Sequence, residues 1–466
     1  MSSTAARPQL RVLSTLNEDG SRRWLRPKLS PGGFWRWRRV VAYALMVVFF
    51  ALPYLRVGGK PLVLLNIPRR EFTILGTTFL PTDTLLLMLL MVSIALGIFL
   101  LTALLGRVWC GWACPQTVYL EFLFRPIERW VEGGRSGSLA LDRDRNQLHP
   151  RRLAKYAIYL VLALFLAHTF LAYFVGIEQL VQWVRRSPWE HPTSFLVMAG
   201  TTAMIFADFA WFREQTCIVA CPYGRLQSVL LDRRSLIVGY DPNRGEPRMR
   251  GVKERAATAG DCIDCGACVQ TCPTGIDIRD GLQMECIHCT QCADACDAIM
   301  DQVGTPRGLI RYTSQDALAG VPSPRLRPRV VLYPAVMAVS LGLLIYNLGT
   351  QVDTEVTLLR GIGAPFTREP TGMIVNQVRV KVTNRAEATR SYRIEVTDGE
   401  PFRLVAPVNP VPVTGGHTIE NSFFVVSPPG EFVAGARDVT IRVSDGAGYR
   451  AEFPYRLQGP GPGATP

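Results

Sequence analysis

The sequence predicts a multi-domain membrane protein: an α-helical bundle of about five spans, an inserted ferredoxin-like α+β domain with two clusters, and a C-terminal immunoglobulin-like β-sandwich. Three observations predict this fold class. Five apolar stretches have membrane-spanning length, eight cysteines follow the spacing of two-cluster ferredoxins, and the C-terminal part alternates apolar and polar residues.

The apolar stretches lie at 37–55, 84–106, 156–177, 193–212 and 330–350. A helix crosses the hydrocarbon core with about 20 residues, so we expect membrane lipid as a partner of each stretch. The run from Trp35 to Arg39 is typical of an interfacial anchor. The predicted regions are an N-terminal segment 1–36, a four-helix membrane region 37–212, a region 213–329 containing the ferredoxin-like domain 255–305, a fifth transmembrane helix 330–350, a β-sandwich 351–458 and a disordered tail 459–466.

Basic residues orient these spans. The formal net charge is +13, and segment 1–39 and loop 107–155 each carry nine Lys and Arg, against four in 56–82 and two in 178–192. Cytoplasmic loops hold the positive excess. We therefore expect a multi-pass protein of the bacterial inner membrane, with its N-terminus and ferredoxin-like domain in the cytoplasm and its β-sandwich in the periplasm. No base-reading motif accompanies the charge, so nucleic acid is not an expected partner.

The strongest motif is a double cysteine run, Cys262-x2-Cys265-x2-Cys268-x3-Cys272-Pro273 and then Cys286-x2-Cys289-x2-Cys292-x3-Cys296. Three cysteines at this spacing wrap one 4Fe–4S cluster, and the fourth reaches the other cluster. Zinc ribbons instead use four ligands in two pairs. We predict cluster one on Cys262, Cys265, Cys268 and Cys296, and cluster two on Cys272, Cys286, Cys289 and Cys292.

Two residues of this run stand apart from the ligands. Asp297 follows Cys296 where ferredoxins of this type have proline, which predicts a more exposed cluster one or a shifted potential. His288 lies inside the second motif, and because four thiolates already fill each cluster we predict a solvated loop residue rather than a ligand.

Two further cysteine pairs follow membrane spans, in the motifs Cys110-x3-Cys114-Pro115 and Cys217-x3-Cys221-Pro222. Residues four apart share a helix face, and a residue before proline favours a helix end. Both pairs are expected at the cytoplasmic edge of the membrane, facing one another. The residues alone leave four readings open: a Cu(I) site, a third iron–sulfur cluster, a thiol–disulfide relay, or buried apolar cysteines.

Two ionisable residues lie within spans, where charge is costly and function is the default hypothesis. Asp208 is near the inner end of the fourth span, and pairing with an interfacial arginine is its alternative role. His168, in the third span, is either a packing residue or a metal or haem ligand.

Beyond residue 350 the periodicity changes to that of strands. Alternating segments start at Val378, Tyr392 and Val439, and turn signals such as Asp398-Gly399 separate them. This spacing predicts an immunoglobulin-like sandwich without cysteine or cofactor motif, suited to docking or structural support.

The order of these parts resembles the cytochrome c oxidase accessory proteins of the FixG/CcoG/RdxA type over nearly the whole chain. The resemblance implies an oxidoreductase that reduces Cu(II) to Cu(I) during assembly of a cbb-type haem–copper oxidase. Copper ions, oxidase assembly factors or a copper transporter would be its partners, and its electron donor is unknown. By the same resemblance, the catalytic candidates that handle copper are Cys110, Cys114, Cys217 and Cys221.

Two other functions remain open from the sequence. One is a quinol-linked electron-transfer subunit, since related polyferredoxins share the Cys-x3-Cys-Pro pairs; the C-terminal part, however, lacks a Cys-x-x-Cys-His haem site. The other is a non-redox assembly scaffold whose working part is the sandwich.

Overall fold

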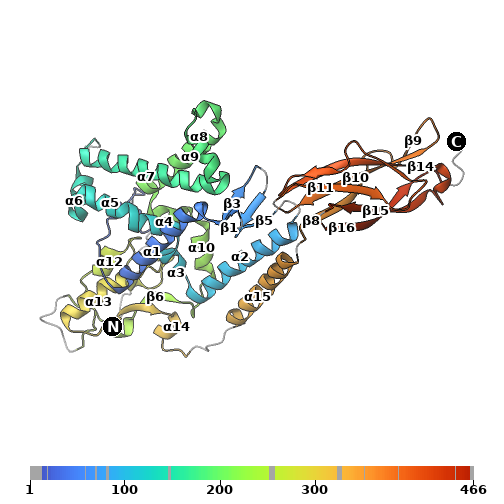
Figure 1. Ribbon diagram of the computed structural model, residues 1–466. Helices are drawn as coiled ribbons and strands as arrows, with labels where there is room; N and C mark the ends of the chain where they lie inside the picture. The colour runs from blue at the N-terminus through green and yellow to red at the C-terminus, as the bar shows by residue number, and fades with distance from the viewer. Residues whose placement is uncertain are drawn as a thin grey trace. The chain divides into compact units, whose positions relative to one another are not determined.

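The computed structural model describes residues 13–461 except 18, 58, 69–70, 80–82, 145–147, 251–257, 323–327, 351, 387 and 447. It consists of two compact units, Met1–Leu344 and Ile345–Pro466 (Figure 1). The first unit contains the cysteine-rich region, and the second contains the C-terminal strands.

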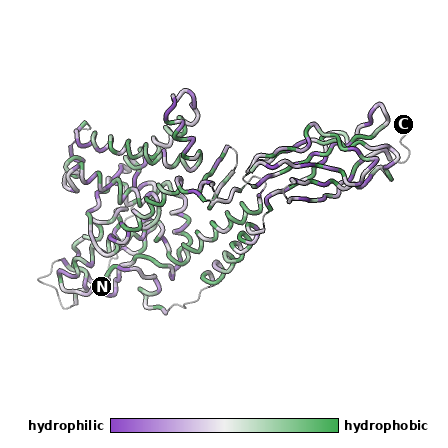
Figure 2. The backbone as a smooth tube through the Cα atoms, viewed as in Figure 1, coloured by the Kyte–Doolittle hydropathy of each residue, from purple (hydrophilic) through white to green (hydrophobic). Residues whose placement is uncertain are grey.

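Five helices of the described residues are long and apolar enough to cross a membrane, which confirms the predicted bundle. In Figure 2, α2 and α15 are hydrophobic along most of their length. The Trp35–Arg39 run forms the first turns of α1, where Trp37 is exposed but Arg38 is fully buried. The spanning helices are α1 Gly33–Ala51, α2 Thr84–Leu105, α7 Pro150–Val175, α9 Pro192–Ala207 with its π-helical extension η4 Asp208–Phe212, and α15 Pro328–Gly349.

Close side-chain packing joins these helices. The ring of Phe124 stacks on that of Phe209 with centroids 4.1 Å apart and meets Tyr159 edge-on at 4.8 Å. Ser93 of α2 and Ser340 of α15 hydrogen-bond through their Oγ atoms at 2.9 Å. Small polar side chains of this kind let membrane helices approach closely.

Shorter elements connect the spans. The segment between α1 and α2 forms the strands β1 Arg56–Val57, β2 Lys60–Pro61, β3 Val63–Asn66, β4 Glu71–Ile74 and β5 Thr77–Phe79. The short helices are α3 Val108–Trp112, α4 Pro115–Tyr119, the π-helical η2 Leu120–Phe124, α5 Arg125–Glu132, α6 Gly134–Arg143, α8 Ile177–Val184, the π-helical η5 Thr216–Ala220, and α10 Pro222–Leu230.

The cysteine-rich region is an α+β domain. Strand β6 (Ile237–Tyr240) pairs antiparallel with β7 (Ile310–Thr313), and the helices α12 (Ala267–Thr271) and α13 (Gln291–Val303) lie between them in sequence. Asp294 of α13 accepts hydrogen bonds from the backbone N–H groups of Phe34 (3.1 Å) and Trp35 (2.7 Å). A carboxylate from the cluster domain thus caps the first membrane helix, whose N-terminus carries partial positive charge. Figure 1 shows the start of α1 beside α13. The region also contains the short helices α11 Pro242–Gly245 and α14 Gln315–Leu318 and the 3-10 helix η6 Ile278–Asp280.

A buried charge network binds the N-terminal segment to the membrane helices. Arg213 contacts both carboxylate oxygens of Glu128 at 3.0 Å, and Lys155 and Arg26 also pair with Glu128. Burial alone would raise the pKa of Glu128, but the attraction of Arg213 and its other cationic partners outweighs burial and holds the pKa well below its usual range. Glu128 is therefore a buried anion that balances the charge of three cations, Arg26, Lys155 and Arg213.

Replacing Glu128 by Gln should cost about 3–5 kcal/mol of stability, because it leaves buried cations without their counter-charge. The measurement is thermal unfolding of the detergent-purified protein. Asp142→Asn is the matched control, since Asp142 also pairs with Arg26 but is more exposed; its cost should stay below about 1 kcal/mol. Equal losses for the two variants would contradict the assignment of Glu128 as the centre of the network.

The second unit is a sandwich of two antiparallel sheets with strand orders β12-β14-β10-β8 and β13-β11-β15-β16, and β9 pairs with β10. Inward residues such as Val380, Ile394 and Phe423 form its core. Of the predicted tail, residues 462–466 lie outside the described part, while Gly459 donates its backbone N–H to Gly435 O at 3.0 Å. The strands are β8 Thr354–Arg360, β9 Thr367–Arg368, β10 Ile374–Asn384, β11 Arg390–Val396, β12 Arg403–Val405, β13 Val411–Val413, β14 His417–Ser427, β15 Ala436–Ser444 and β16 Arg450–Gln458.

Candidate functional site

The eight ferredoxin-type cysteines line two neighbouring cavities. Quartet one lines the first cavity together with Tyr240 and Arg279, and it comprises Cys262, Cys265, Cys268 and Cys296. Quartet two lines the second with Thr290 and Ile287, and it comprises Cys272, Cys286, Cys289 and Cys292; Cys268 borders this cavity as well. Among the described residues, no three Cys, His, Asp or Glu side chains gather tightly enough for a single metal ion. Each crossed set of four thiols instead surrounds a space of its own.

The same backbone pattern shapes both cysteine loops. Asp264 and His288 stand two residues after the first cysteine of each motif, and both have left-handed φ values, +51° and +53°. Gly266 and Thr290 occupy the next equivalent positions, also left-handed, at +67° and +57°. Left-handed turns at these positions curl a short chain, which lets three closely spaced cysteines face one cavity.

The fourth cysteines sit differently in the two motifs. Cys272 follows the end of α12 and precedes Pro273, whereas Cys296 lies in the middle of α13, which continues to Val303. Asp297 permits this continuation because it keeps the backbone N–H that a proline would lack. Its carboxylate also accepts a hydrogen bond from Gly308 N at 2.9 Å.

The structure contradicts the prediction that His288 is a solvated loop residue. His288 is fully buried, and its Nδ1 accepts a hydrogen bond from Arg107 N at 3.1 Å. Burial, assisted by the charge of Arg107, lowers the pKa of His288 to about 3. The ring is therefore neutral with its proton on Nε2, and it holds the second motif against the end of α2.

The other cysteine motifs meet at the ends of α2 and η4. Cys110 lies in α3 and Cys217 in η5, while Cys114 and Cys221 immediately precede the proline-started helices α4 and α10. Each of these four thiols interacts electrostatically with the other three, so the two pairs lie together. We call Cys110, Cys114, Cys217 and Cys221 the membrane quartet.

Burial raises the thiol pKa of three members of the membrane quartet, Cys110, Cys114 and Cys217. It raises the pKa of Cys110 to about 11, although the nearby Arg107 opposes the rise. It raises the pKa of Cys217 to about 12, and the neighbouring thiols add to the rise. Cys110 donates its S–H to Gln227 Oε1 at 3.0 Å. A soft metal that binds protonated thiols has to displace their protons.

Metal binding at the membrane quartet should therefore strengthen as pH rises between about pH 6 and pH 9, by about tenfold per pH unit for each proton displaced. The affinity rises with pH because the pKa values of Cys110 and Cys217 lie above this whole range, so protons compete less strongly with the metal as the pH increases. Competition with a Cu(I) chelator of known pH dependence measures the effect. An affinity that does not change with pH would show that the thiols are already ionised.

The membrane quartet touches quartet two directly. Cys110 packs in one apolar cluster with Ile287 and Cys289. A Cβ placed on Gly111 would lie 2.5 Å from Ile287 O and 2.8 Å from Cys289 Cα. Only glycine allows this backbone-to-backbone contact, which joins the membrane motif to the second cluster motif.

The structure decides against one of the two roles left open for Asp208. Asp208 does not pair with an arginine in the contacts of the described residues; its Oδ1 accepts hydrogen bonds from Gln116 Nε2 at 3.1 Å and from Thr216 Oγ1. Gln116 follows the first Cys-x3-Cys-Pro motif and Thr216 precedes the second. Asp208 therefore ties the two cysteine pairs together.

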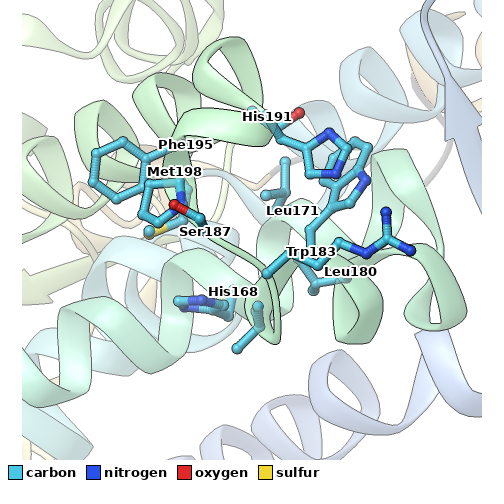
Figure 3. A pocket seen from close by; sticks show the side chains of 12 residues that line it. His168, Leu171, Leu180, Trp183, Ser187, His191, Phe195 and Met198 are labelled. Atoms are coloured by element: carbon cyan, nitrogen blue, oxygen red, sulfur yellow. The ribbon is translucent and has the colours of Figure 1, made fainter.

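His168 lies at the other end of the membrane helices, in a pocket between α7, α8 and α9 (Figure 3). Its Nδ1 donates to Leu164 O at 2.8 Å, which leaves Nε2 as an acceptor. The ring of His191 packs at a tilt of 31° against Trp183 with centroids 5.3 Å apart, and its buried Nε2 has no hydrogen-bond partner among the described residues. Leu171, Phe195 and Met198 supply apolar walls.

Sequence reasoning missed Arg38, Gln227 and Gly111. Arg38 was assigned to an interfacial anchor, yet it lies buried beside Cys289 and donates from Nε to Gly111 O at 2.8 Å. A basic residue at the start of an otherwise apolar span was the available signal. Gln227 and Gly111 carried none, because their roles arise from tertiary contacts.

Comparisons with known proteins agree with this arrangement. A family model described as a 4Fe-4S dicluster domain matches residues 212–315, and one described as a 4Fe-4S binding domain matches 87–133. A model described as an IG-like fold at the C-terminal of FixG matches 344–460. The 87–133 match contains Cys110 and Cys114, and the 212–315 match contains Cys217 and Cys221 as well as quartets one and two.

Three relatives extend the match to nearly the whole chain. Protein RdxB of Cereibacter sphaeroides is 35% identical over 90% of this chain and 91% of its own length. Nitrogen fixation protein FixG of Rhizobium meliloti is 30% identical over 95% and 94%. Protein RdxA of Cereibacter sphaeroides is 33% identical over 86% and 89%. Together with the spans and the cysteine architecture, these matches show that the chain belongs to the FixG/RdxA family of membrane-bound iron–sulfur electron-transfer proteins.

Proposed function

We propose that this protein passes electrons from two 4Fe–4S clusters, held by quartets one and two, to Cu(II) at the membrane quartet, and so supplies Cu(I) for assembly of a cbb-type haem–copper oxidase. One cluster gives up one electron, Cu(II) becomes Cu(I), and the thiols release protons as they bind the metal. Soft thiolates favour Cu(I) over Cu(II). Reduction therefore tightens binding at the quartet.

The contact between Gly111 and the Ile287–Cys289 backbone carries this proposal. Cys110 lies in one apolar cluster with Ile287 and Cys289, a predicted ligand of cluster two, so an electron leaving that cluster has a short covalent and packed path to the membrane quartet. At the other end of the pair of clusters, Cys265 of quartet one is exposed and offers an entry point for a soluble donor.

The positive-inside rule supports a cytoplasmic location for this chemistry. In the structure, the cluster domain caps the start of α1 through Asp294 and meets the end of α2 through His288. Both helix ends belong to the same side of the bundle as the Arg-rich N-terminal segment. The sandwich would then lie in the periplasm, where oxidase assembly factors or a copper transporter are its proposed partners.

The test is anaerobic reduction of the purified protein by a low-potential donor, followed by addition of Cu(II) and a Cu(I)-specific chelator. Wild type should reoxidise its clusters as Cu(I) appears, one copper per electron. Gly111→Val should slow this step strongly while retaining its iron, because the added side chain must separate the two backbones. Gly97→Val, on α2 with open space around it, is the control. Cluster-loaded wild type that leaves Cu(II) unreduced would disprove the proposal.

The pocket around His168 and His191 favours a second candidate function, oxidation of a membrane quinol. Its apolar walls suit an isoprenoid quinone, and the free Nε2 of His168 can accept a hydroxyl proton. Against this function, the pocket lies at the opposite end of α7 and α9 from the cysteines, and no cysteine occurs between Cys114 and Cys217.

A quinol analogue distinguishes the two candidates. If quinol is the donor, the analogue should reduce the clusters of wild type, and His168→Ala should abolish that reduction. Thr201→Ala, on α9 but outside the pocket lining, should leave it unchanged. Clusters that stay oxidised with the analogue but respond to a low-potential donor exclude the quinol function.

A further inference from the structure

We propose that Arg38, a residue of the first membrane helix, donates its terminal guanidinium N–H groups to the sulfur atoms of cluster two and thereby raises the reduction potential of that cluster above the potential of cluster one. The proposal rests on the two-cluster part of the proposed function and is independent of copper.

The position of Arg38 is unusual for a cation. Its side chain is fully buried, and its Nε donates a hydrogen bond to Gly111 O at 2.8 Å. Both terminal nitrogens, Nη1 and Nη2, are buried without a hydrogen-bond partner among the described residues. Leaving such charged donors unsatisfied is costly, so a buried acceptor is expected beside them.

Quartet two supplies that acceptor. Burial raises the pKa of Cys289, and the charge of Arg38 is the main influence that opposes the rise. The geometry agrees: Arg38 Nε bonds to Gly111 O, and a Cβ on Gly111 would lie 2.8 Å from Cys289 Cα. Arg38 therefore lies near Cys289, which lines the cavity of quartet two. A 4Fe–4S cluster with four thiolates carries net negative charge and exposes sulfur acceptors, which matches the two free N–H groups of Arg38 in charge and in donor type.

One carboxylate, Asp294, interacts with Arg38 through its charge, but its oxygens accept hydrogen bonds from Phe34 N and Trp35 N rather than from the guanidinium. A second buried cation, Arg107, interacts with Cys286 of the same quartet. The surroundings of quartet two are therefore cationic.

Quartet one has the opposite surroundings. Its nearby cation, Arg279, is neutralised by Asp277 at 2.6 Å and Asp264 at 2.5 Å. Asp297, directly after Cys296, adds a further negative charge. Adding an electron makes a cluster more negative, so cationic donors favour reduction and carboxylates oppose it. Electrons should settle on cluster two, next to Gly111 and the membrane quartet.

Redox titration monitored by EPR tests this inference. The signals are first assigned with Cys296→Ser, which should lack cluster one, and Cys272→Ser, which should lack cluster two. In wild type, cluster two should be reduced at the higher potential. Arg38→Leu should weaken reduction of cluster two by about tenfold, which is 59 mV for one electron, and leave cluster one unchanged. Arg38→Lys keeps the charge but loses the planar pair of donors, so its cluster-two potential should lie between those of wild type and Arg38→Leu.

Arg39→Leu is the matched control, because Arg39 is the next residue of α1 but is exposed and stacks on Trp35. It should leave both potentials unchanged. Equal shifts of both clusters, an unchanged cluster two in Arg38→Leu, or a lower potential for cluster two than for cluster one in wild type would each overturn the proposal. Copper reduction could persist in any of these cases, so the copper proposal is tested separately.

Discussion

Cys296→Ser should remove cluster one and spare cluster two, although Cys296 belongs to the second cysteine motif. Cys272→Ser should do the reverse, although Cys272 belongs to the first. Each variant should keep about four of the eight irons that two 4Fe–4S clusters carry. Few single substitutions in this chain should have a larger effect, because a cubane with three protein thiolates loses its anchor on one iron.

The physical reason is the crossed arrangement of the cavities. Cys296 projects from the middle of α13 into the cavity that Cys262, Cys265 and Cys268 line. Cys272, at the end of α12, lines the cavity of Cys286, Cys289 and Cys292 instead. The fourth cysteine of each motif therefore lines the cavity formed by the first three cysteines of the other motif.

Iron analysis and EPR of the two variants measure this exchange. Asp297→Ala is the control, since it changes the residue beside Cys296 without removing a thiol; it should retain both clusters. A Cys296→Ser protein that loses the signal of cluster two would contradict the crossed ligation. If variants without clusters still support normal oxidase assembly in cells, the scaffold function would replace electron transfer.

Much of this architecture was predictable because its determinants are local. Apolar length specifies the five spans, alternation specifies strands such as β10 and β15, and cysteine spacing specifies the cluster loops. The predicted helix ends at Cys114 and Cys221 follow from the prolines after them. In each case the sequence within a few residues determines the conformation.

The errors concern residues whose surroundings come from distant segments. His288 was expected in solvent because it lies in a loop, but the end of α2 covers that loop and buries it. For Asp208 an arginine partner was one of two open roles, and its neighbours are instead Gln116 and Thr216 from the two cysteine motifs. Arg38 was expected at a membrane interface, whereas the cluster domain folds over it. The type of a residue does not show which distant segment of the chain will pack against it.

Replacing Cys110 and Cys217 together by alanine should abolish Cu(II) reduction and leave eight irons per protein. One cysteine is lost from each pair, so no set of three thiolates remains in the membrane quartet. The 87–133 family match names 4Fe-4S binding in the region of Cys110, which makes a third cluster the competing occupant of the same four thiols. Metal analysis distinguishes the two occupants. If the quartet binds copper, the double replacement leaves the iron content of the protein unchanged.

The competing result is also specific. About twelve irons in wild type, falling to eight in the double variant together with a third EPR signal, would assign the quartet to a cluster and remove copper from it. The matched control is Thr117→Ser, which lies beside the quartet and keeps every thiol. Electron flow through Gly111 would survive that outcome, since a third cluster at Cys110 would take electrons from cluster two along the same contact. The two results therefore decide what receives the electron, while the contact between Cys289 and Gly111 decides how it arrives.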